Sequence, residues 1–288
     1  MPDLQITSFA NPRVKHAVKL RQRPYRDGAG QMLVEGYREC RRALDSGYQP
    51  QMLFCCEELY LKHLNEPEIV QRCREQGAEI LACPAAVFQK LAYRERPDGL
   101  LIVGPQLSRK LADLRLPEHA LVVVAEAIEK PGNLGTILRS ADAAGVQAVI
   151  VCDRCTDIHN PNVVRASTGT LFSVPVVEAE SDEALAFLRG RGFRILAATP
   201  HAESLHAEVD LTGNVAIAVG AEQYGLTEKW MSAADLRVRI PMLGVADSLN
   251  VSAATTILLF EAVRQRIAAG QVRVPAPEAW HGETAFDA

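Results

Sequence analysis

Two glycines and an acidic residue form the segment of this sequence whose chemistry is easiest to interpret. An apolar run rich in β-branched residues, 215–219, ends at Gly220, as expected for a buried parallel strand that enters a tight loop. Gly220 and Gly225 have the spacing of the glycines in a phosphate-binding loop, but Leu226 stands where that loop has its lysine. Glu222 adds a carboxylate that would repel a polyphosphate. The loop therefore predicts a nucleoside pocket that does not take a nucleotide polyphosphate.

A second polar cluster stands at the start of the last predicted helix. A short strand at 237–240 stops before a proline, and an amphipathic helix then runs to about residue 266. Ser248 is predicted to cap this helix, and Asn250 and Ser252 offer further side-chain oxygens beside its first N–H groups. Capping alone would explain any one of these residues. Together with the glycine loop, the three indicate the hydrogen-bonding rim of a binding site.

The surrounding elements predict a parallel sheet, because short apolar strands alternate with helices. Strands are expected at 120–125, 147–152, 173–177 and 194–198, with helices starting at Asn133 and spanning 183–189. Ligands of such sheets bind beyond the carboxyl ends of the strands, where Thr199, Gly220 and Ile240 stand. Arg139 lies off the apolar face of the helix that starts at Asn133, so we expect it to point to a cleft or a partner.

The first third of the chain predicts a smaller α/β domain of its own. Its expected helices are 35–46, 67–76 and 85–91, and its expected strands are 51–56, 79–83 and 99–103. The segment that follows has mixed polarity and no clear period. We therefore expect one domain at 1–105, a linker at 106–118, a second domain at 119–270 and a loosely docked tail at 271–288.

Length and composition limit the class of protein. With 288 residues, of which 48% are hydrophobic, the chain can form two domains with ample cores. It has no run of about 18 apolar residues and no apolar signal region at its N-terminus, so we expect neither a membrane span nor secretion. Seven cysteines, an odd number, fit reduced thiols better than a disulfide framework. The expected location is the cytoplasm.

A C-x-x-C pattern at Cys152 and Cys155, with His159 four residues further on, raises the possibility of a metal site. A zinc site normally has a second pair at a matching spacing, and the adjacent Cys55 and Cys56 do not supply one. Ordinary cysteines at the end of a strand are the better interpretation, so no metal is expected.

Basic character is concentrated in the first domain. Residues 1–110 hold 17 Lys and Arg against 13 Asp and Glu, whereas residues 111–288 hold 14 against 22. A basic run near the N-terminus could neutralise RNA phosphates, although a solvated helix face is a serious alternative. Arg94 and Arg96, in a predicted exposed turn, could also touch RNA. The residues of the basic run expected to bind RNA are Arg13, Lys15, Lys19 and Arg21.

Three segments carry a resemblance to a known family. The stretch from Lys130 to Val146 contains KPGNLGTILRSADAAGV, and GAEQYGL begins at Gly220. The third segment combines RIPM, which contains Ile240, with SLNVSAAT, which begins at Ser248. Together these segments resemble the three motifs of the SpoU (TrmH-like) RNA 2′-O-ribose methyltransferases of the SPOUT superfamily, over residues 120 to 268. Residues 1 to about 105 resemble, less specifically, the ribosomal-protein-like substrate-binding domain that many members carry.

The resemblance implies a reaction, a cofactor and an architecture. Members transfer a methyl group from S-adenosylmethionine to a ribose 2′-hydroxyl in rRNA or tRNA, and they act as homodimers. Their C-terminal α/β domain has a parallel sheet and a deep trefoil knot. The basic first domain favours rRNA as the substrate here. One departure from many relatives is the loop 125–130, where an aspartate is common, and this departure leaves the identity of the target nucleotide open.

The resemblance also assigns roles to residues by their motif positions. In the family proposal, the arginine at the position of Arg139 activates the 2′-hydroxyl. Because an arginine is ordinarily too basic to act as a base, our hypothesis is that Arg139, supplied across the dimer interface, grips the phosphate next to the target ribose and stabilises the developing alkoxide. The residues at catalytic and substrate-orienting positions are Asn133, Arg139, Glu222, Ser248 and Asn250. Those expected to contact the cofactor are Gly220, Ile240, Leu249 and Thr199.

Two other functional classes stay open at this point. A non-catalytic RNA-binding or ribosome-assembly factor of the same fold would retain RNA affinity without transfer, although the intact motif residues speak against it. A nucleotide-binding enzyme is disfavoured by the missing lysine of the glycine loop. Within the methyltransferase class, tRNA is the alternative to rRNA.

Overall fold

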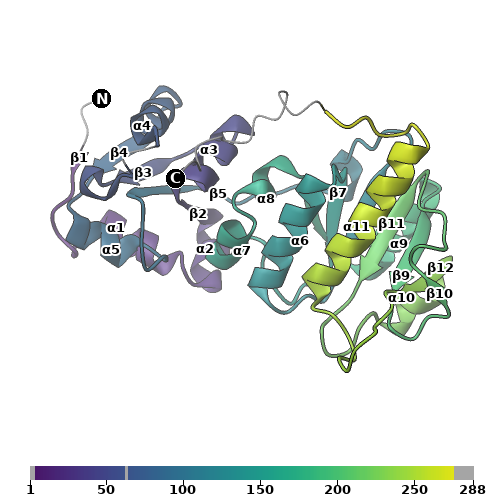
Figure 1. Cartoon of the computed structure of the whole chain (residues 1–288). Helices are drawn as coiled ribbons and strands as arrows, with labels where there is room; N and C mark the ends of the chain where they lie inside the picture. The colour runs from purple at the N-terminus through teal and green to yellow at the C-terminus, as the bar shows by residue number, and fades with distance from the viewer. Residues whose placement is uncertain (1–3, 62–63, 276–288) are drawn as a thin grey trace.

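The computed structural model describes residues 4–61 and 64–275, which form two α/β domains arranged side by side (Figure 1). The N-terminal domain reaches from the start of the described chain to Pro105, and the C-terminal domain begins at Leu121. The connecting segment contains one short 3-10 turn, Leu111–Asp113. Of the predicted tail, residues 271–275 have no regular structure and the remainder lies outside the described residues.

The N-terminal domain is built on a five-stranded mixed sheet with the order β1-β4-β3-β5-β2. Strand β5 runs antiparallel to both of its neighbours, β3 and β2, while the pairs β1–β4 and β3–β4 are parallel. In chain order the elements are β1 (Leu4–Gln5), α1 (Pro12–Lys19), α2 (Arg23–Ala29), β2 (Gln31–Glu35), α3 (Tyr37–Asp45), β3 (Met52–Cys55), a 3-10 turn (Glu57–Leu59), α4 (Glu66–Glu75), β4 (Glu79–Ala82), α5 (Ala85–Leu91) and β5 (Leu100–Pro105).

The C-terminal domain is built on a seven-stranded sheet with the order β10-β12-β9-β11-β6-β7-β8, and every pairing in it is parallel. The parallel sheet confirms the predicted fold class. In chain order the elements are β6 (Leu121–Glu126), α6 (Pro131–Ala143), β7 (Ala148–Cys152), α7 (Pro161–Ala166), α8 (Thr170–Ser173), β8 (Val176–Ala179), α9 (Ser181–Gly190), β9 (Arg194–Ala198), β10 (Ser204–Leu205), β11 (Val215–Val219), α10 (Glu228–Ala233), β12 (Leu236–Arg239) and α11 (Val251–Ala268).

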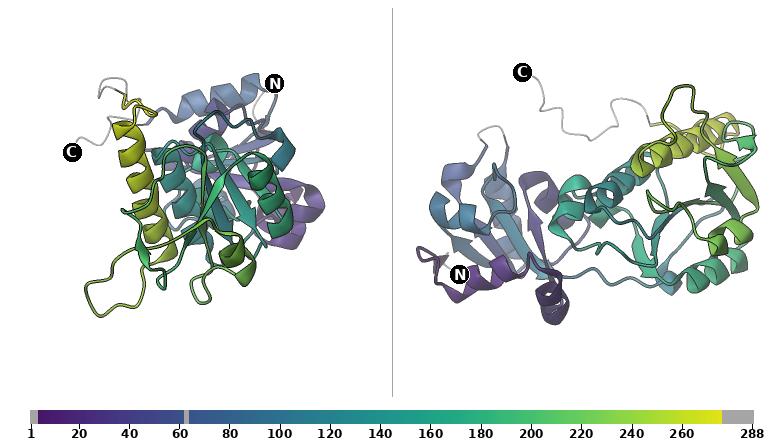
Figure 2. Two further views of the ribbon diagram at one scale, coloured as in Figure 1. Left: turned by 90° about the vertical axis from the view of Figure 1, so that its right-hand side faces the viewer. Right: turned by 90° about the horizontal axis from the view of Figure 1, so that it is seen from below.

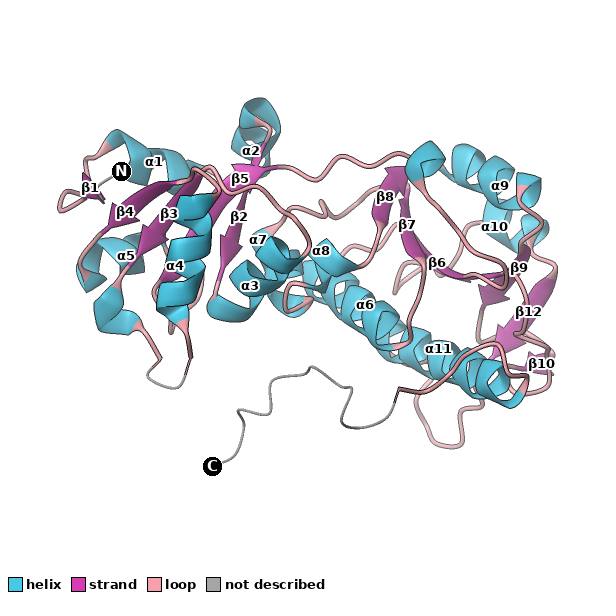
Figure 3. Cartoon of the chain, turned by 90° about the horizontal axis from the view of Figure 1, so that it is seen from above, coloured by secondary structure: helices cyan, strands magenta, loops and turns pink. Residues whose placement is uncertain are grey.

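Strand β6 shows why this sheet is covered on both faces. Its alternate residues Leu121 and Val123 pack in one hydrophobic cluster with residues of α6 and α11, while Val122 and Val124 pack in another with residues of α9 and α10. Figure 2 shows α11 on one side of the sheet and α9 with α10 on the other, and in Figure 3 α6 and α11 lie together on the side opposite α9 and α10. A strand buried on both faces is apolar throughout, which is the pattern that the sequence displays here.

Several predicted boundaries were wrong. Residues 170–173 form the helical turn α8, and the strand predicted at 173–177 is β8, which begins only at Val176. Residues 31–35 form β2, a strand that was not predicted, so Glu35 ends a strand and does not begin the following helix. Helix α6 begins at Pro131, two residues before the predicted start, because proline suits the first helical position, where no N–H partner is needed.

Among the described residues, no helix has the length and apolar character needed to cross a membrane.

The two domains are held together by a shared hydrophobic cluster and by polar contacts. The cluster contains Val34 and Cys40 of the N-terminal domain together with Val163 and Leu171 of the C-terminal domain. The guanidinium of Arg42 donates hydrogen bonds of 2.6 and 2.7 Å to the carbonyl and hydroxyl oxygens of Thr168. Because apolar and polar contacts act together at this junction, it resembles a packed core more than a flexible hinge.

A buried ion pair also crosses this junction. Arg26 of α2 pairs with Asp157, which precedes α7, and their side chains are only 1% and 4% exposed. Arg26 also donates hydrogen bonds of 2.9 and 2.8 Å to the carbonyl oxygens of Leu20 and Arg21. A buried pair of this kind requires precise placement of both charges, so it fixes the orientation of one domain on the other.

Candidate active site

A cavity of about 530 Å³ opens where three neighbouring strands of the parallel sheet end. Its walls come from the segments that follow β9, β11 and β12 and from the first turns of α11. This is the carboxyl edge of a parallel sheet, where ligands of such folds bind. Six of the predicted site residues line it: Thr199, Gly220, Glu222, Ile240, Ser248 and Leu249.

The glycine loop folds back on itself in a way that only glycine permits. A side-chain carbon placed on Gly220 would lie 2.2 Å from both the carbonyl carbon and the carbonyl oxygen of Gly225. Gly225 has a φ of +69°, and its N–H donates a 2.8 Å hydrogen bond to the carbonyl of Ala221. The sequence predicted that Gly220 gives a ligand close access to the backbone. The structure shows a further reason for glycine, which is that the loop itself occupies the space of a side chain.

A buried carboxylate holds the far end of this loop. Glu126, at the end of β6, is fully buried and accepts hydrogen bonds of 2.8 and 2.6 Å from the backbone N–H and the hydroxyl of Thr227. Hydrogen bonds to a charged acceptor are stronger than neutral ones, so this contact fixes where the loop leaves the cavity. Sequence reasoning missed Glu126 because it was placed in a loop. The available signal was an acidic residue directly after a wholly apolar strand.

The starts of α6 and α11 meet beside the cavity. The side-chain amide of Asn250 donates a 3.2 Å hydrogen bond to the Oδ1 of Asn133, and the Oδ1 of Asn250 accepts bonds of 3.0 and 2.6 Å from the backbone and hydroxyl of Ser252. Asn250 is therefore the N-cap of α11, and the prediction that Ser248 caps this helix was wrong. Asn133 lies in the first turn of α6, outside the residues that line the cavity.

The amide nitrogen of Asn133 points to a missing partner. It is buried and forms no hydrogen bond with any described residue. Buried polar groups are normally satisfied, and an orphaned donor beside a cavity is a feature of sites that complete their hydrogen bonds with a ligand. The Asn133 amide is thus available as a hydrogen-bond donor to a group bound between α6 and α11.

The sequence alone shows no partner for Glu222, but the structure pairs it with a cation. Its carboxylate forms an ion pair with Lys130, the residue that precedes α6. The hydrogen bond with Glu222, followed by the attraction between the two charges, raises the pKa of the Lys130 ammonium above its ordinary value. Lys130, where the loop 125–130 meets α6, thus supplies a cation to the acidic residue of the glycine loop.

Arg139 stands apart from the cavity of its own chain. It lies on the exposed side of α6, does not line the cavity and forms no side-chain hydrogen bond or ion pair with a described residue. The neighbouring residue Ser140 is hydrogen bonded at 2.7 Å to Thr256, which ties α6 to α11. The structure therefore brings Asn133, Glu222, Ser248 and Asn250 to one edge of the domain and leaves Arg139 on an open helix face.

The cavity fits S-adenosylmethionine by shape and charge. Apolar side chains, among them Ile240, Leu249 and Leu258, line it and suit an adenine ring, while the loop backbone around Gly220 presents N–H and carbonyl groups. Its charged lining residues, Glu222, Asp247 and Arg239, carry both signs, which suits a ligand that bears a carboxylate as well as cationic groups. The glycine loop in its wall also lacks the lysine of a phosphate-binding loop, so the lining matches a nucleoside better than a nucleotide polyphosphate.

The predicted RNA-binding residues of the first domain divide into two groups. Arg13 makes hydrogen bonds of 2.8 and 2.6 Å to the carboxylate of Glu79, and Arg21 donates bonds of 2.7 and 2.5 Å to the carbonyls of Lys90 and Ala92. These two arginines are engaged within the domain, whereas Lys15 and Lys19 are exposed on α1. Only Arg13 is paired with a carboxylate, and among the described residues the two lysines form no hydrogen bond or ion pair, so their charges are the most available to RNA.

The C-x-x-C cysteines do not converge with other ligands. Cys152 is buried at the end of β7, where desolvation raises the pKa of its thiol to about 12, and Cys155 is exposed. Within residues 4–61 and 64–275, no group of three or more His, Cys, Asp or Glu side chains is placed to hold a metal ion. The expected lack of a metal stays a prediction.

Family models match both domains of the chain. The model of the SpoU rRNA Methylase family matches residues 120–260, and that of the MRM3-like substrate binding domain matches residues 11–102. A 23S rRNA (uridine(2479)-2′-O)-methyltransferase from Streptomyces viridochromogenes is 32% identical over 265 residues, which is 89% of this chain and 90% of the relative. Both domains of the chain therefore match known families, and they follow one another in the order that the sequence predicted.

Solved structures agree with this assignment. An RNA 2′-O ribose methyltransferase is 42% identical with a TM-score of 0.80, covering 92% of this chain and 100% of that one. The rRNA methyltransferase from Sinorhizobium meliloti with bound AdoMet is 30% identical with a TM-score of 0.82, covering 90% of this chain and 97% of that one. The chain thus belongs to the SpoU rRNA methylase family, whose members are S-adenosylmethionine-dependent RNA 2′-O-ribose methyltransferases.

Proposed function

We propose that this protein transfers a methyl group from S-adenosylmethionine to the 2′-hydroxyl of one ribose in 23S rRNA. The observation that carries the proposal is the meeting of the cofactor-shaped cavity with the paired starts of α6 and α11, where Asn250 contacts Asn133. The choice of 23S rRNA is supported by the Streptomyces relative, whose name states that substrate, and by the substrate-binding domain that precedes the catalytic one. The cytoplasm is the proposed location.

Gly220, Ile240 and Leu249 would hold the cofactor, with Thr199 at the edge of the same cavity. The bound cofactor supplies an electrophilic methyl group. The protein itself has to align the ribose oxygen with that methyl group, and positioning of this kind contributes roughly 7–11 kcal/mol in well-oriented reactions. Asn133, Ser248 and Asn250 provide the polar rim that would orient the ribose, and Glu222 with Lys130 provides a charge pair beside it.

Arg139 is proposed to act in the site of a second copy of the chain. Its guanidinium lies outside the cavity of its own chain, on the exposed side of α6, and the next residue, Ser140, contacts α11. Ile257 and Phe260 of α11 are 37% and 46% exposed, so apolar surface is available for self-association close to the catalytic helices. In a homodimer formed through these helices, Arg139 would grip the phosphate next to the target ribose and stabilise the alkoxide as the 2′-hydroxyl loses its proton. The deep trefoil knot remains a prediction from the resemblance, and the stated domain boundaries remain predictions from the sequence pattern.

The test of the function is methyl transfer from labelled S-adenosylmethionine to unmodified rRNA and, separately, to unmodified tRNA. Nuclease digestion then shows whether the label is on ribose. We expect ribose label in rRNA, and we expect Arg139→Ala and Arg139→Lys to lower turnover at least about 100-fold while cofactor affinity is unchanged. Arg191→Gln, which changes an exposed arginine after α9, is the matched control and should leave turnover intact.

Three results would contradict parts of this proposal. Label in tRNA alone would change the substrate class, and normal turnover of both Arg139 variants would remove that residue from the reaction. Cofactor binding with no transfer to any RNA would favour a non-catalytic assembly factor.

Mixed dimers test whether Arg139 acts across an interface. Arg139→Ala and Gly220→Ala are each expected to be inactive alone, the second because the added methyl group displaces the loop that forms the cavity. In a mixed dimer, the intact cavity of the first variant would meet the Arg139 of the second, so activity should return in part. No recovery on mixing, with dimers demonstrated by mass measurement, would place Arg139 in the site of its own chain.

A further inference from the structure

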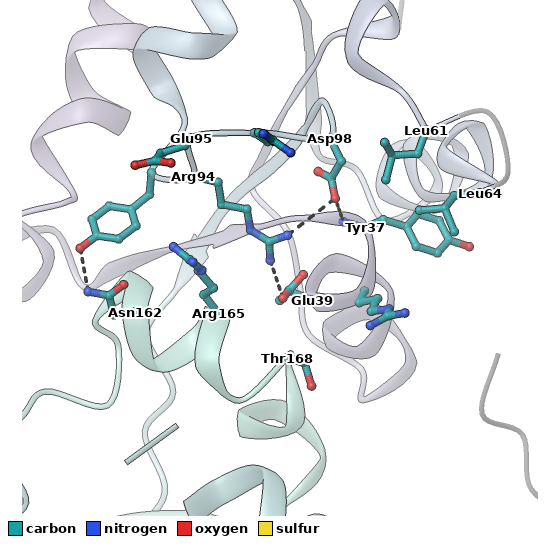
Figure 4. Close-up of a pocket in the computed structure, with 13 residues that line it drawn as sticks. Tyr37, Glu39, Leu61, Leu64, Arg94, Glu95, Asp98, Asn162, Arg165 and Thr168 are labelled. Atoms are coloured by element: carbon teal, nitrogen blue, oxygen red, sulfur yellow. Dashed lines mark hydrogen bonds and ion pairs between the residues drawn. The ribbon is translucent and has the colours of Figure 1, made fainter. Parts of the chain in front are cut away.

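A second and larger cavity, of about 890 Å³, lies at the junction of the two domains (Figure 4). We call it the junction pocket. Its walls come from the start of α3 and from the segment 93–98 in the substrate-binding domain, and from α7 and Thr168 in the methyltransferase domain. It shares no lining residue with the cofactor cavity, so it is a separate site.

The floor of the junction pocket is fixed by buried carboxylates. Asp98 accepts a 2.8 Å hydrogen bond from the backbone N–H of Tyr37, and Glu35 accepts bonds of 2.7 and 3.2 Å from the N–H groups of Tyr93 and Arg94. The guanidinium of Arg94 lies 2.5 Å from a carboxylate oxygen of Glu39. Because these contacts hold the segment 93–98 from behind, the pocket is shaped before any ligand arrives.

The exposed charged side chains that line the pocket are two arginines, Arg96 and Arg165, and one carboxylate, Glu95, so basic groups predominate at its rim. Arg96 of the substrate-binding domain and Arg165 of α7 are both exposed, and neither guanidinium forms a hydrogen bond or ion pair within the described part of the chain. In Figure 4, Arg165 extends from α7 toward the substrate-binding domain. Unpartnered guanidinium groups at the mouth of a preformed cavity are suited to phosphate, whose oxygens they bind in a bidentate manner.

An aromatic ring completes the pocket. Tyr93 is 38% exposed, and its hydroxyl accepts a 2.8 Å hydrogen bond from the side-chain amide of Asn162 in α7. The ring is therefore held by both domains while part of its surface stays open. Partly exposed tyrosine rings beside basic residues are the usual platform on which an unpaired nucleobase stacks.

We propose that the junction pocket receives one unpaired nucleotide of the substrate RNA, with its base against Tyr93 and its flanking phosphates on Arg96 and Arg165. This inference rests on the proposed function, since it assumes that the substrate is RNA. The nucleotide is distinct from the target ribose, because the pocket and the cofactor cavity have no residue in common. One arginine belongs to each domain, so RNA bound here contacts both and sets its register relative to the catalytic site.

The buried Arg26–Asp157 pair and the Arg42–Thr168 contacts supply the fixed domain orientation that the proposed nucleotide site requires. A nucleotide site shared between two domains works only if their relative orientation is fixed. In a mobile junction, Arg96 and Arg165 would move relative to each other. Aligning them on two phosphates would then cost conformational entropy when RNA binds. The rigid junction and the basic rim are therefore parts of one RNA-positioning device.

The experiment measures the affinity of the full-length protein for an unmodified 23S rRNA transcript at several salt concentrations, with cofactor affinity measured in parallel. We expect Arg96→Gln and Arg165→Gln each to weaken RNA binding about tenfold and to reduce the slope of log affinity against log salt by about one, as loss of one phosphate contact does. Arg165→Lys should recover part of the affinity. Arg191→Gln is the matched control and should bind RNA as the wild type does.

The stacking role of Tyr93 has its own pair of variants. Tyr93→Phe removes only the hydroxyl that contacts Asn162, whereas Tyr93→Ala removes the ring. We expect RNA affinity to fall about tenfold for Tyr93→Ala and to change little for Tyr93→Phe. Unchanged cofactor affinity and thermal unfolding would show that the methyltransferase domain is intact in each variant.

The outcomes separate this inference from the proposed function. If the wild type methylates ribose and the glutamine variants bind RNA with wild-type affinity and salt slope, the junction pocket is not an RNA site and the proposed function stands. If the wild type methylates no RNA, the proposed function fails, and direct RNA binding still decides whether the pocket holds a nucleotide. Equal losses for Tyr93→Phe and Tyr93→Ala would overturn the stacking role.

Discussion

The side-chain amide of Asn250 donates a 3.2 Å hydrogen bond to the Oδ1 of Asn133, joining two helix starts that are 117 residues apart in the sequence. Asn250 has a double task, because its own Oδ1 accepts hydrogen bonds from the backbone and hydroxyl of Ser252 and so caps α11. The same residue thus stabilises a helix and positions a neighbour whose amide nitrogen has no described partner.

These two tasks can be separated by substitution. Asn250→Ala loses both, and loss of the cap should destabilise the protein by about 1 kcal/mol. Asn250→Asp keeps the cap but replaces the donor to Asn133 with a carboxylate. We expect Asn250→Asp to unfold at nearly the wild-type temperature and to turn over at least about 100-fold more slowly. Wild-type turnover of Asn250→Asp would show that its contact with Asn133 is not used in catalysis.

Gly220→Ala should weaken cofactor binding strongly. The added methyl group would lie 2.2 Å from backbone atoms of Gly225, which a flexible side chain could avoid but a backbone cannot, so the loop has to open. We expect the dissociation constant for S-adenosylmethionine to rise at least about 30-fold, or about 2 kcal/mol, in calorimetric titration. Gly132→Ala is the control, since nothing lies within 4 Å of its added carbon. Tight binding by Gly220→Ala would disprove the close packing of the loop.

Glu126 is expected to control cofactor affinity without touching the cofactor. Glu126→Gln retains the shape of the side chain but weakens the hydrogen bonds with Thr227, and bonds to charged groups are worth about 1.5–3 kcal/mol. We expect about a tenfold rise in the dissociation constant for S-adenosylmethionine. Thr227→Val removes only the hydroxyl contact and should have a smaller effect. If Glu126→Gln binds the cofactor as the wild type does, the buried carboxylate serves folding alone.

The Arg26–Asp157 pair should dominate the stability of the domain junction. Removal of one member of a buried pair typically costs about 3–5 kcal/mol, because the other charge is left without compensation. We therefore expect Asp157→Asn to lower the free energy of unfolding by about 3 kcal/mol in urea titration. Glu79→Gln breaks the more exposed pair with Arg13 and should cost less than about 1 kcal/mol. Similar losses for the two variants would contradict the burial of the junction pair.

The stabilisation from Asp157 should also disappear in acid. Burial alone raises the pKa of Asp157, but hydrogen bonds from His159 and Arg26 and the charge of Arg26 outweigh it and hold the pKa well below its usual value. A carboxyl group with a lowered folded pKa contributes its full stabilisation above the unfolded pKa of about 3.9, and the contribution is lost as the pH falls further. The stability difference between the wild type and Asp157→Asn should therefore be constant from pH 5 to 7 and shrink below about pH 4. A constant difference down to pH 2.5 would disagree with this account.

The sequence by itself determined the parallel sheet of the C-terminal domain and the edge at which its site lies. Strands buried on both faces are apolar throughout, and parallel strands present their carboxyl ends together, so Thr199, Gly220 and Ile240 could be placed at one edge from local patterns alone. The motifs then identified the family. Local patterns were less reliable at element boundaries: Glu35, the last residue of β2, was assigned to the following helix, and Ser248 was given the cap that Asn250 provides.

The tertiary structure decided which charged residues are available for chemistry. In the sequence, Arg13, Arg21 and Arg26 all belong to one basic run, yet the fold turns Arg13 to Glu79, Arg21 to backbone carbonyls and Arg26 to Asp157. Helical and strand periods describe neighbours within a few residues, whereas these partners are 66 to 131 residues away. The contacts of Asn133 with Asn250 and of Lys130 with Glu222 have the same origin. Only the packing of distant segments brings such groups together, because no local pattern encodes which surfaces will meet.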